Sequence, residues 1–534
     1  GELDGIAWSG ITEDYTVGWA DVTNYFLTNN ISGAWIGHFF ANMGRYEELP
    51  EDLKVHKPYI DAVTYDSPFA DGARMRRVTE VIDCWFDSGA MPFAQYHYPF
   101  DNESIDTDGR FPADYICEAV DQTRGWFYSL HALSTLLNDQ PSYKNVICLG
   151  LVLDGRGQKM SKRVGNVVEP LAVLDAHGAD ALRWYLFTAS HPGEPRRFSD
   201  KLVNETLRRV ILTLWNVYSF FTNYATIDEF HPGQVPQDWK PENELDRWIL
   251  SELNGLVSQV DDYLESYNPT DAGRRIQEFI DGLSNWYVRR SRRRFWKSEN
   301  DGDKLSAYIS LYTCLETVAR LMAPLVPFIA EELYQNLVKS VEADAPDSVH
   351  LALFPEADAS LIDEPLMEAT RLAMRFSSMG RAARSKAGLR VRQPLSQFRI
   401  VVRNEIEARQ VKDLSEQLEE ELNVKKVSTY VIDSFDEVDF WDWDIAPNMA
   451  KVGPKYGGRS QHIAQSLASL EPRQVAMEVR LGHSVGLPGQ DDETPPVQLA
   501  ADEITLTKNA PAGFSTVEEG PYVVAIETGI TPDS

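Results

Sequence analysis

The sequence has few cysteines, and their spacing excludes one common kind of site. Four cysteines occur among 534 residues, and none of them stands in a Cys-x-x-Cys pair. A zinc site built from cysteine pairs is therefore not expected, and no other metal site is predicted. Cys84, Cys117 and Cys148 lie inside apolar segments. These positions predict buried, reduced thiols of a cytoplasmic protein.

Long apolar runs are also missing. No stretch reaches the roughly 18 consecutive apolar residues that a membrane-spanning helix needs, so no membrane partner is expected. Internal repeats and extended low-complexity tracts are absent as well. With 43% hydrophobic and 11% aromatic residues, the chain is long enough for about three or four domains with large cores.

Positive charge is scarce. The chain has 51 Lys and Arg against 81 Asp and Glu, which gives a formal net charge of -30. Any contact with RNA would have to be made through local basic patches. The alternative interpretation is that the acidic surface simply keeps the protein in solution.

The most informative stretch is the basic loop at residues 159–163. An apolar run at 146–153 predicts a buried strand that ends in a turn at 154–157, and residues 169–190 have helical apolar spacing. The loop between them carries Lys159 and Lys162. Such a mobile loop can place two ammonium donors on a polyphosphate. The alternative is an ordinary solvated basic segment.

Residues 158–166 resemble the second signature of the class I aminoacyl-tRNA synthetases, except that the usual fifth Ser is Arg163. Other stretches resemble the isoleucyl members of that family, namely 78–89, 111–114, 118–127 and 285–290. Residues 84–89 and 121–127 favour the isoleucyl over the valyl or leucyl enzymes. The resemblance covers roughly residues 55–534, and the tail is similar to the eukaryotic-like branch.

This resemblance implies an isoleucine–tRNA ligase, which activates isoleucine with ATP and transfers it to tRNA(Ile). ATP would arrive with Mg²⁺. The implied catalytic residues are Lys159, Ser161 and Lys162. Charge stabilisation by the lysines at the α-phosphate would drive adenylate formation, without a covalent enzyme intermediate.

The adenylate and amino-acid sites are expected where a short strand at 115–117 meets a helix that starts near residue 125. Carboxylates at the carboxyl edge of a strand, next to a helix start, lie where open α/β sheets bind ligands. Glu118, Asp121 and Gln122, with Lys162, are the predicted ATP and adenylate ligands. The alternative is that Asp121 and Arg124 form only a local cap and ion pair. By resemblance, the isoleucine pocket is lined by Trp85, Asp87 and Trp126, although Trp85 could instead be core.

The family's first signature, a His-x-Gly-His pair, is not found, and neither is the threonine-rich peptide of the editing domain. The chain is therefore expected to be the C-terminal part of a longer or split enzyme. It would act as a monomer or paired with a missing N-terminal half, and would be inactive alone. The competing hypothesis is a non-catalytic tRNA-binding protein derived from a synthetase.

Beyond residue 199, helical spacing predicts a bundle of about four or five helices at 202–224, 245–267, 271–296 and 304–338, the last broken by Pro324 and Pro327. By resemblance this is the anticodon-binding domain. Two basic clusters are predicted to contact tRNA phosphates: Arg289, Arg290, Arg293 and Arg294, and Arg381, Arg384, Arg390 and Arg392. The alternative is that half of the first cluster pairs with bundle acids such as Glu278 and Asp281.

The complete prediction is an α/β fold, the second half of a Rossmann-like catalytic domain, followed by the helical bundle and a small α+β appendage. The predicted limits are 1–54 (unassigned), 55–200 (catalytic), 201–354 (bundle) and 355–534 (junction helix and appendage). In the appendage, a helix is predicted at 405–422 and strands at 398–402, 427–432, 475–479, 503–506 and 522–527.

Overall fold

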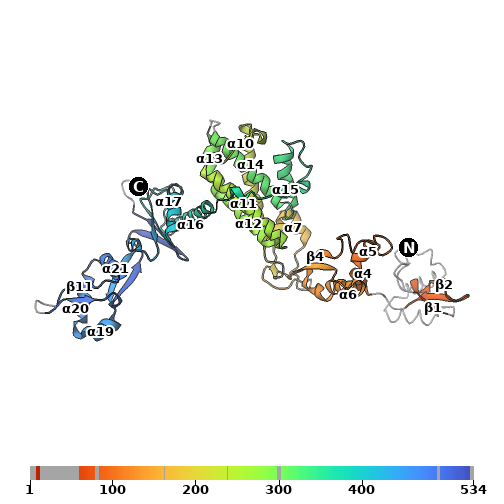
Figure 1. Cartoon of the computed structure of the whole chain (residues 1–534), viewed down its shortest axis with the longest axis horizontal. Helices are drawn as coiled ribbons and strands as arrows, with labels where there is room; N and C mark the ends of the chain where they lie inside the picture. Colours follow the sequence, from red (N-terminus) through yellow and green to blue (C-terminus); the bar gives the residue numbers. More distant parts are fainter. Residues whose placement is uncertain are drawn as a thin grey trace. The chain divides into compact units, whose positions relative to one another are not determined.

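A computed structural model describes residues 8–11, 59–78, 83–161, 163–236, 238–297, 302–489 and 494–529. The chain forms two compact units (Figure 1). The first comprises Gly1–Met160 with Pro192–Arg197, and the second comprises Ser161–His191 with Phe198–Ser534. Residues 1–58, apart from 8–11, lie outside the described part, as does Lys162.

The first unit contains a parallel strand–helix–strand arrangement. Strand β4 (Ala113–Ala119) continues through the short helix η3 (Val120–Arg124) into α6 (Trp126–Asn138), which leads to β5 (Tyr143–Leu149). The β4 and β5 strands pair in parallel, from Ala113 opposite Tyr143 to Ala119 opposite Leu149. The remaining elements are β1 (Trp8–Ile11), β2 (Thr64–Asp66), β3 (Arg74–Arg77), α4 (Cys84–Gly89), α5 (Met91–Ala94), β6 (Val152–Leu153) and β7 (Arg196–Arg197).

The predicted strand at 146–153 is in fact two strands, β5 and β6. Gly150 separates them, and its N–H donates to the Pro192 carbonyl at 2.6 Å. A Cβ at this position would lie 2.2 Å from the Glu194 carbonyl oxygen, so only glycine allows the chains to approach so closely. The turn predicted after the strands is confirmed, because the Gly157 N–H donates to the Asp154 carbonyl at 2.9 Å.

The prediction of buried thiols is wrong for two of the three cysteines named. Cys84 and Cys117 are exposed and Cys148 is half-buried, whereas Cys314 is buried. Burial was expected because all three cysteines lie in apolar segments. Within the described residues, β4 and β5 pair only with each other, so the apolar side chains of this pair stay partly open.

The second unit begins with two helices where one was predicted. Helices α7 (Pro170–His177) and α8 (Ala179–Thr188) are separated by Gly178, whose φ of 81° ends α7. The long helices predicted for the bundle are confirmed. They are α9 (Asp200–Thr206), α10 (Leu212–Ile227), α11 (Glu244–Glu265), α12 (Pro269–Gly282), α13 (Arg289–Trp296), α14 (Gly302–Met322) and α15 (Pro327–Tyr334).

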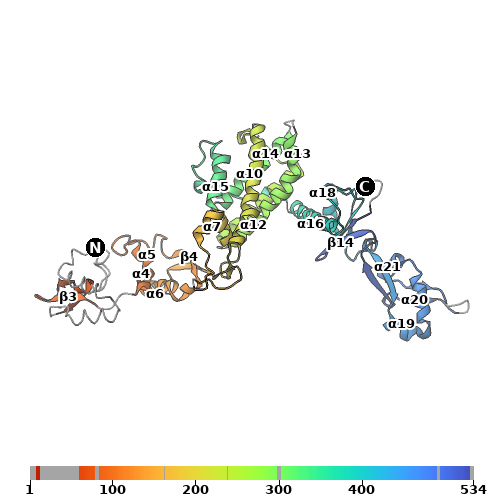
Figure 2. The same cartoon turned by 180° about the vertical axis from the view of Figure 1, so that it is seen from behind.

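Short π-helical segments at 207–211 and 283–288 join α9 to α10 and α12 to α13. Helices α10, α12 and α14 pack side by side, as Figure 2 shows from behind, and α11 packs against α12 and α14. Their apolar faces enclose a core that includes Leu253, Ile276 and Leu315. As predicted, the chain breaks between α14 and α15 at Pro324 and Pro327, because proline cannot continue a helix.

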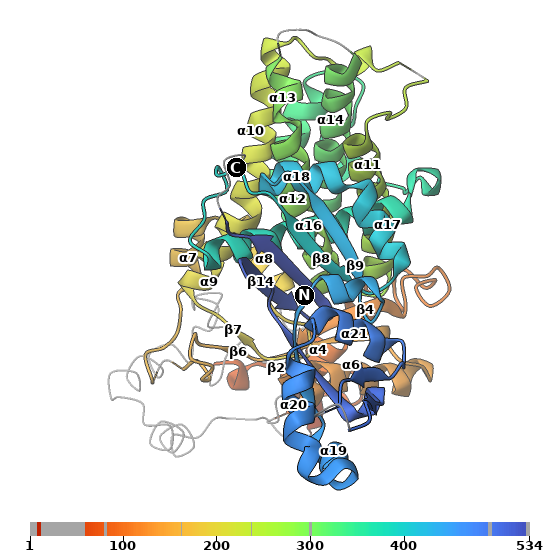
Figure 3. The ribbon, with the colours of Figure 1, turned by 90° about the vertical axis from the view of Figure 1, so that its left-hand side faces the viewer.

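The long helix α16 (Glu364–Lys386) packs on a four-stranded sheet of order β14-β15-β8-β9 (Figure 3). The sheet consists of β8 (Phe398–Val402), β9 (Val427–Val431), β14 (Phe514–Glu519) and β15 (Tyr522–Glu527). Strands β8 and β9 are parallel, and the helix predicted between them is split at Leu414 into α17 (Glu405–Asp413) and α18 (Ser415–Leu422). The core of α16 continues into the sheet through Phe376, Phe398 and Val524.

The last lobe contains β10 (Asp442–Pro447), α19 (Met449–Tyr456), α20 (Ser460–Ala468), α21 (Pro472–Arg480), β11 (Val485–Leu487), β12 (Val497–Leu499) and β13 (Ile504–Asn509). The strand predicted at 475–479 is wrong, because these residues lie in α21. Glu471 caps that helix by accepting from the Gln474 N–H, and Pro472 occupies its first turn. Val475 and Val479, four residues apart, both face one core. None of the helices that the structure describes is long and apolar enough to cross a membrane.

Candidate functional site

The predicted amino-acid pocket lies where α4 meets α6. Asp83 caps α4 by accepting from the Trp85 N–H at 3.0 Å. At the other end of α4, a Cβ on Gly89 would lie 2.8 Å from the Ser129 carbonyl carbon, so the two helices touch through their backbones. The short helix is therefore held in one orientation against α6.

Trp85, Gln122 and Trp126 are brought together around Gly125. The Gln122 side-chain oxygen accepts from the Trp126 N–H at 2.9 Å and so caps α6, while the Trp126 indole donates to the Ser88 carbonyl at 2.9 Å. A Cβ on Gly125 would lie 2.7 Å from the Gln122 oxygen and 3.0 Å from the Trp85 ring. Sequence reasoning did not single out Gly125 or Ser88, although the Gly-Trp dipeptide at a helix start was a signal for a close approach.

The exposure of Trp85 distinguishes between its two interpretations, as a residue of the isoleucine pocket or as a core residue. Its side chain is 41% exposed and that of Phe86 is 51% exposed, so Trp85 is not a core residue of this unit. Asp87 is exposed on the same short helix. An open aromatic face beside a rigid turn is suited to bind an apolar group, and this arrangement remains a candidate pocket.

Glu118 and Asp121 lie at the carboxyl end of β4, both exposed. Glu118 is opposite Cys148 in the parallel register. Burial and the Glu118 carboxylate raise the pKa of the neighbouring Cys117 thiol. In the described part of the chain Asp121 and Arg124 form no ion pair, so the purely local alternative is not supported.

Part of the basic loop is held by its neighbours. The Asp154 carboxylate accepts from the N–H groups of Arg156 and Gln158 at 2.9 and 2.8 Å, and Leu153 bridges to Lys159. Lys159 belongs to the first unit and is exposed. In the second unit, the Ser161 N–H donates to the Asn166 side chain at 2.9 Å. The predicted role of Lys162 falls outside the described residues.

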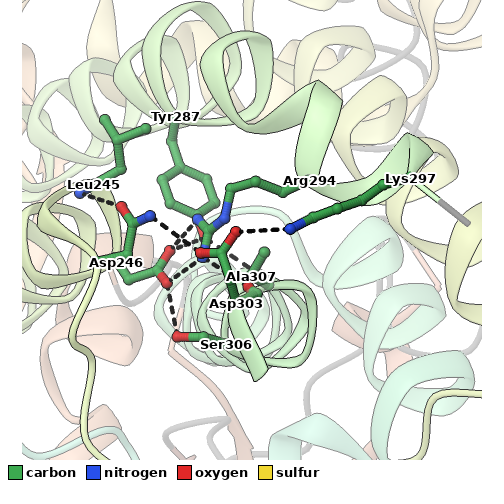
Figure 4. Close-up of polar contacts among 9 residues, drawn as sticks. Leu245, Asp246, Tyr287, Arg294, Lys297, Asp303, Ser306 and Ala307 are labelled. Atoms are coloured by element: carbon green, nitrogen blue, oxygen red, sulfur yellow. Dashed lines mark hydrogen bonds and ion pairs between the residues drawn. The ribbon is translucent and has the colours of Figure 1, made fainter. Parts of the chain in front are cut away.

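Arg294 lies inside the bundle rather than on its surface (Figure 4). Its guanidinium donates to both carboxylate oxygens of Asp246 at 2.7 and 2.6 Å, and to the Asp303 carbonyl at 2.9 Å. Tyr287 and Ser306 donate to the same carboxylate at 2.6 and 2.7 Å. Burial opposes the charge of Arg294, but the hydrogen bonds and charge of Asp246 outweigh it and raise the pKa of the guanidinium.

A second carboxylate, that of Glu421 on α18, forms ion pairs with three more of the predicted RNA ligands. Its side chain is 5% exposed, pairs with Arg289, and accepts from Arg290 at 3.2 Å and Arg381 at 3.1 Å. Arg289, Arg290 and Arg294 therefore do pair with acidic side chains. The partners are Asp246, Asp303, Glu420 and Glu421, and not the Glu278 and Asp281 suggested from the sequence.

These contacts correct the list of RNA-contacting residues. Arg294 is 8% exposed and Arg384 is 1% exposed, so neither side chain can reach a phosphate on the surface. Arg293, Arg390 and Arg392 are exposed and remain candidates. Arg292 and Trp296, which belong to the same run on α13, are also exposed, Trp296 by 57%.

No group of three or more His, Cys, Asp or Glu side chains in the described residues is placed to hold a metal ion.

Two family models match the chain. Residues 41–198 match the class I tRNA synthetases (I, L, M and V), and residues 246–399 match the anticodon-binding domain of tRNA ligases. Residues 41–198 therefore belong to a class I tRNA synthetase domain. The predicted resemblance to this family is confirmed, as is the mixed α/β and helical architecture.

Similar curated proteins are isoleucine–tRNA ligases. The enzyme of Dehalococcoides mccartyi is 61% identical over 391 residues, which cover 72% of this chain and 38% of that protein. Those of Clostridium novyi and Thermus thermophilus are 44% and 43% identical over 92% and 90% of this chain, and over 47% and 45% of their own lengths. The chain thus spans less than half the length of these relatives.

Among solved structures, an Agrobacterium radiobacter K84 LeuRS in complex with tRNA and LeuAMS matches 57% of this chain and 36% of its own, with a TM-score of 0.46 and 20% identity. This likeness is too low for an inference about the present chain.

Proposed function

We propose that the chain is the C-terminal part of an isoleucine–tRNA ligase, which forms isoleucyl-adenylate from isoleucine and ATP and transfers the isoleucyl group to tRNA(Ile). One observation carries the proposal. Gln122 and Gly125, around which Trp85 and Trp126 come together, follow the carboxyl end of β4 and lie in the stretch that matches the class I synthetases. Ligands of open α/β sheets bind at this edge.

The residues present can supply the following parts of the reaction. Trp85, Asp87 and Trp126 would line the isoleucine pocket, and Glu118, Asp121 and Gln122 would hold the ribose and the ammonium group. Lys159 and Lys162, with Ser161 between them, would stabilise the charge that develops on the phosphates of ATP. Mg²⁺ would accompany the triphosphate.

The partner of the first unit would be the remainder of the synthetase. Tyr115 and Val146 on the β4–β5 pair are 51% and 45% exposed, and Leu136 and Leu137 at the end of α6 are 81% and 67% exposed. Two parallel strands alone are not an independently stable sheet, so further strands and helices are needed to cover them. The active enzyme would therefore need further strands and helices on this pair, and would work in the cytoplasm.

The test is ATP–pyrophosphate exchange by the full-length synthetase, with isoleucine, valine and leucine supplied separately. We expect isoleucine to be activated with the highest kcat/KM. Preferential activation of valine or leucine would contradict the assignment of substrate. In the same enzyme, Lys162→Ala should lower kcat for adenylate formation by about 10²–10³, the scale of removing one donor that acts in the transition state. A rise in KM with unchanged kcat would contradict that role.

A further inference from the structure

The loop that follows α16 begins with a backbone arrangement that fixes its direction. Gly388 has a φ of 70°, its N–H donates to the Ser385 carbonyl at 3.0 Å, and the Leu389 N–H donates to the Arg384 carbonyl at 2.9 Å. This pair of bonds is a Schellman motif, which ends a helix in a defined left-handed turn. Residues 388–394 therefore leave α16 along one path.

The side chain of Arg384 then ties this loop to a second one. Its Nη1 donates to the carbonyls of Arg390 at 2.9 Å and Gln393 at 3.0 Å. Its Nη2 donates to the carbonyls of Leu422 at 2.5 Å and Asn423 at 3.0 Å. The last two carbonyls end α18, where they have no partner within the helix and where a cation is favoured.

No carboxylate shares this buried guanidinium in the described residues. Four carbonyl oxygens accept from its Nη1 and Nη2 instead, and its Nε has no hydrogen-bond partner in that part of the chain. The planar fork of arginine can span two loops in this way, whereas a lysine ammonium cannot.

Further bonds complete the connection. The Asn423 side chain donates to the Val391 carbonyl at 3.1 Å, and the Leu395 N–H donates to the Asn423 carbonyl at 3.0 Å. The Lys425 N–H donates to the Leu395 carbonyl at 3.0 Å, and Leu395 bridges in parallel to Val424. Residues 388–394 and 423–426, the clasped loops, therefore lie side by side, with the carbonyls of 390, 391 and 393 bonded inward.

Four cations stand on the clasped loops: Arg390 and Arg392 on the first, and Lys425 and Lys426 on the second. All four are exposed, and none of them forms an ion pair within the described residues. In a chain with 81 acids against 51 Lys and Arg, four unneutralised cations on two bonded loops are unusual. The neighbouring arginines Arg289, Arg290 and Arg381, in contrast, each form an ion pair with Glu421.

We propose that the clasped loops form a single RNA phosphate-binding surface, in which Arg390, Arg392, Lys425 and Lys426 contact the tRNA backbone and Arg384 is a positioning residue. The proposal rests on the proposed function, which makes tRNA the ligand. The first loop ends inside the region that matches the anticodon-binding domain, whereas Lys425 and Lys426 lie beyond residue 399, where that match stops. The structure thus extends the RNA surface to a segment that the family model does not cover.

The first experiment measures binding of a tRNA(Ile) transcript to the full chain by fluorescence anisotropy over a series of KCl concentrations. Each phosphate contact adds about 0.7–0.9 to the slope of log K against log salt. The double variant Lys425→Ala/Lys426→Ala should lower that slope by about 1.5. The matched control, Arg409→Ala/Lys412→Ala, removes two exposed cations from α17 and should leave the slope unchanged.

A second variant separates positioning from stability. Arg384→Lys keeps the charge but cannot bond four carbonyls, so it should also lower the slope of log K against log salt. When it is combined with Lys425→Ala/Lys426→Ala, the slope should fall by less than the sum of the two separate effects. A lower Tm with an unchanged slope would overturn the positioning role. An unchanged slope in the Lys425/Lys426 variant would overturn the shared surface, while the proposed function stands if the wild-type chain binds tRNA. Absence of binding by the wild-type chain would overturn both.

Discussion

At the scale of single residues, the sequence identified the chemistry of the arginines but not their partners. The run from Arg289 to Lys297 contains no acid, so it was interpreted as an RNA surface. Asp246 and Glu421, which bind Arg294 and Arg289, are 48 and 132 residues away along the chain. Local pattern cannot reveal contacts over such separations, because they depend on how the helices pack.

The Asp246–Arg294 pair gives a prediction of stability. Asp246→Ala should lower the free energy of unfolding of the helical bundle by about 3–5 kcal/mol, because it removes the carboxylate that pairs with a buried guanidinium and accepts the shortest hydrogen bond of the Tyr287 hydroxyl. Guanidinium-induced unfolding followed by tryptophan fluorescence measures the change. The control is Arg293→Ala, an exposed neighbour, which should change stability by less than about 0.5 kcal/mol. Equal effects of the two variants would show that the buried pair has no special role.

Gly125 gives a prediction of activity at the same scale. In the full-length enzyme, Gly125→Ala should raise the KM for isoleucine, because the new methyl group would lie 3.0 Å from the Trp85 ring and 2.7 Å from the Gln122 oxygen and would displace both. ATP–pyrophosphate exchange at varied isoleucine measures the KM. Gly233→Ala is the matched control, since nothing lies within 4 Å of a Cβ there. If both variants keep the wild-type KM, Trp85 does not line the pocket.

At the scale of elements, periodicity worked best where an element is long. The bundle helices were predicted because 14 to 22 residues of α12, α10 and α11 repeat the same apolar spacing. Short segments gave mixed results, since the strands predicted at 398–402, 427–432 and 522–527 are found as β8, β9 and β15. Residues 475–479 are apolar enough for a strand, but the Glu471 cap and Pro472 start a helix instead. The segments 146–153 and 169–190, each predicted as one element, are divided at Gly150 and Gly178. Gly150 allows the close approach of the Glu194 backbone, and Gly178 has a positive φ.

The lobe that contains β10, α21 and β13 gives a prediction of pH dependence. Glu437 is 1% exposed and accepts from Lys508 at 2.5 Å, Arg480 at 2.9 Å and the Trp441 indole at 2.9 Å. Burial opposes ionisation, but these donors outweigh it and lower the pKa of Glu437. A lowered pKa stabilises the fold above the unfolded pKa, and this stability is lost as the pH falls through the folded pKa.

Glu437→Gln should therefore lower the Tm of the lobe most at pH 6–7, and the difference from wild type should shrink as the pH falls below the usual glutamate pKa of about 4.3. Thermal unfolding between pH 3 and pH 7 measures it. Glu416→Gln serves as the control, because Glu416 is exposed and makes no ion pair in the described residues. A difference in Tm that stays constant with pH would contradict the ionised state assigned to Glu437.

At the scale of the whole chain, two electrostatic effects oppose each other. With a net charge of -30, the excess acidic side chains repel one another and destabilise the compact state. Salt screens this repulsion. The internal ion pairs around Asp246, Glu421 and Glu437 are favourable, but they are buried and are screened much less. The repulsion among the excess acidic charges can be predicted from composition alone. Only the structure shows that the attractive ion pairs are buried and so protected from the solvent.

The Tm of the full chain should therefore rise between 0.05 M and 0.5 M NaCl at pH 7, because the Debye length shrinks from well above to well below about 10 Å across this range. Thermal unfolding followed by circular dichroism measures the change, and KCl should give the same rise if screening is responsible. The rise should also persist in Arg409→Ala/Lys412→Ala, which makes the surface still more negative and leaves the buried pairs intact. A Tm that falls with salt would mean that the ion pairs, and not the excess of acidic charge, dominate the electrostatic part of the stability.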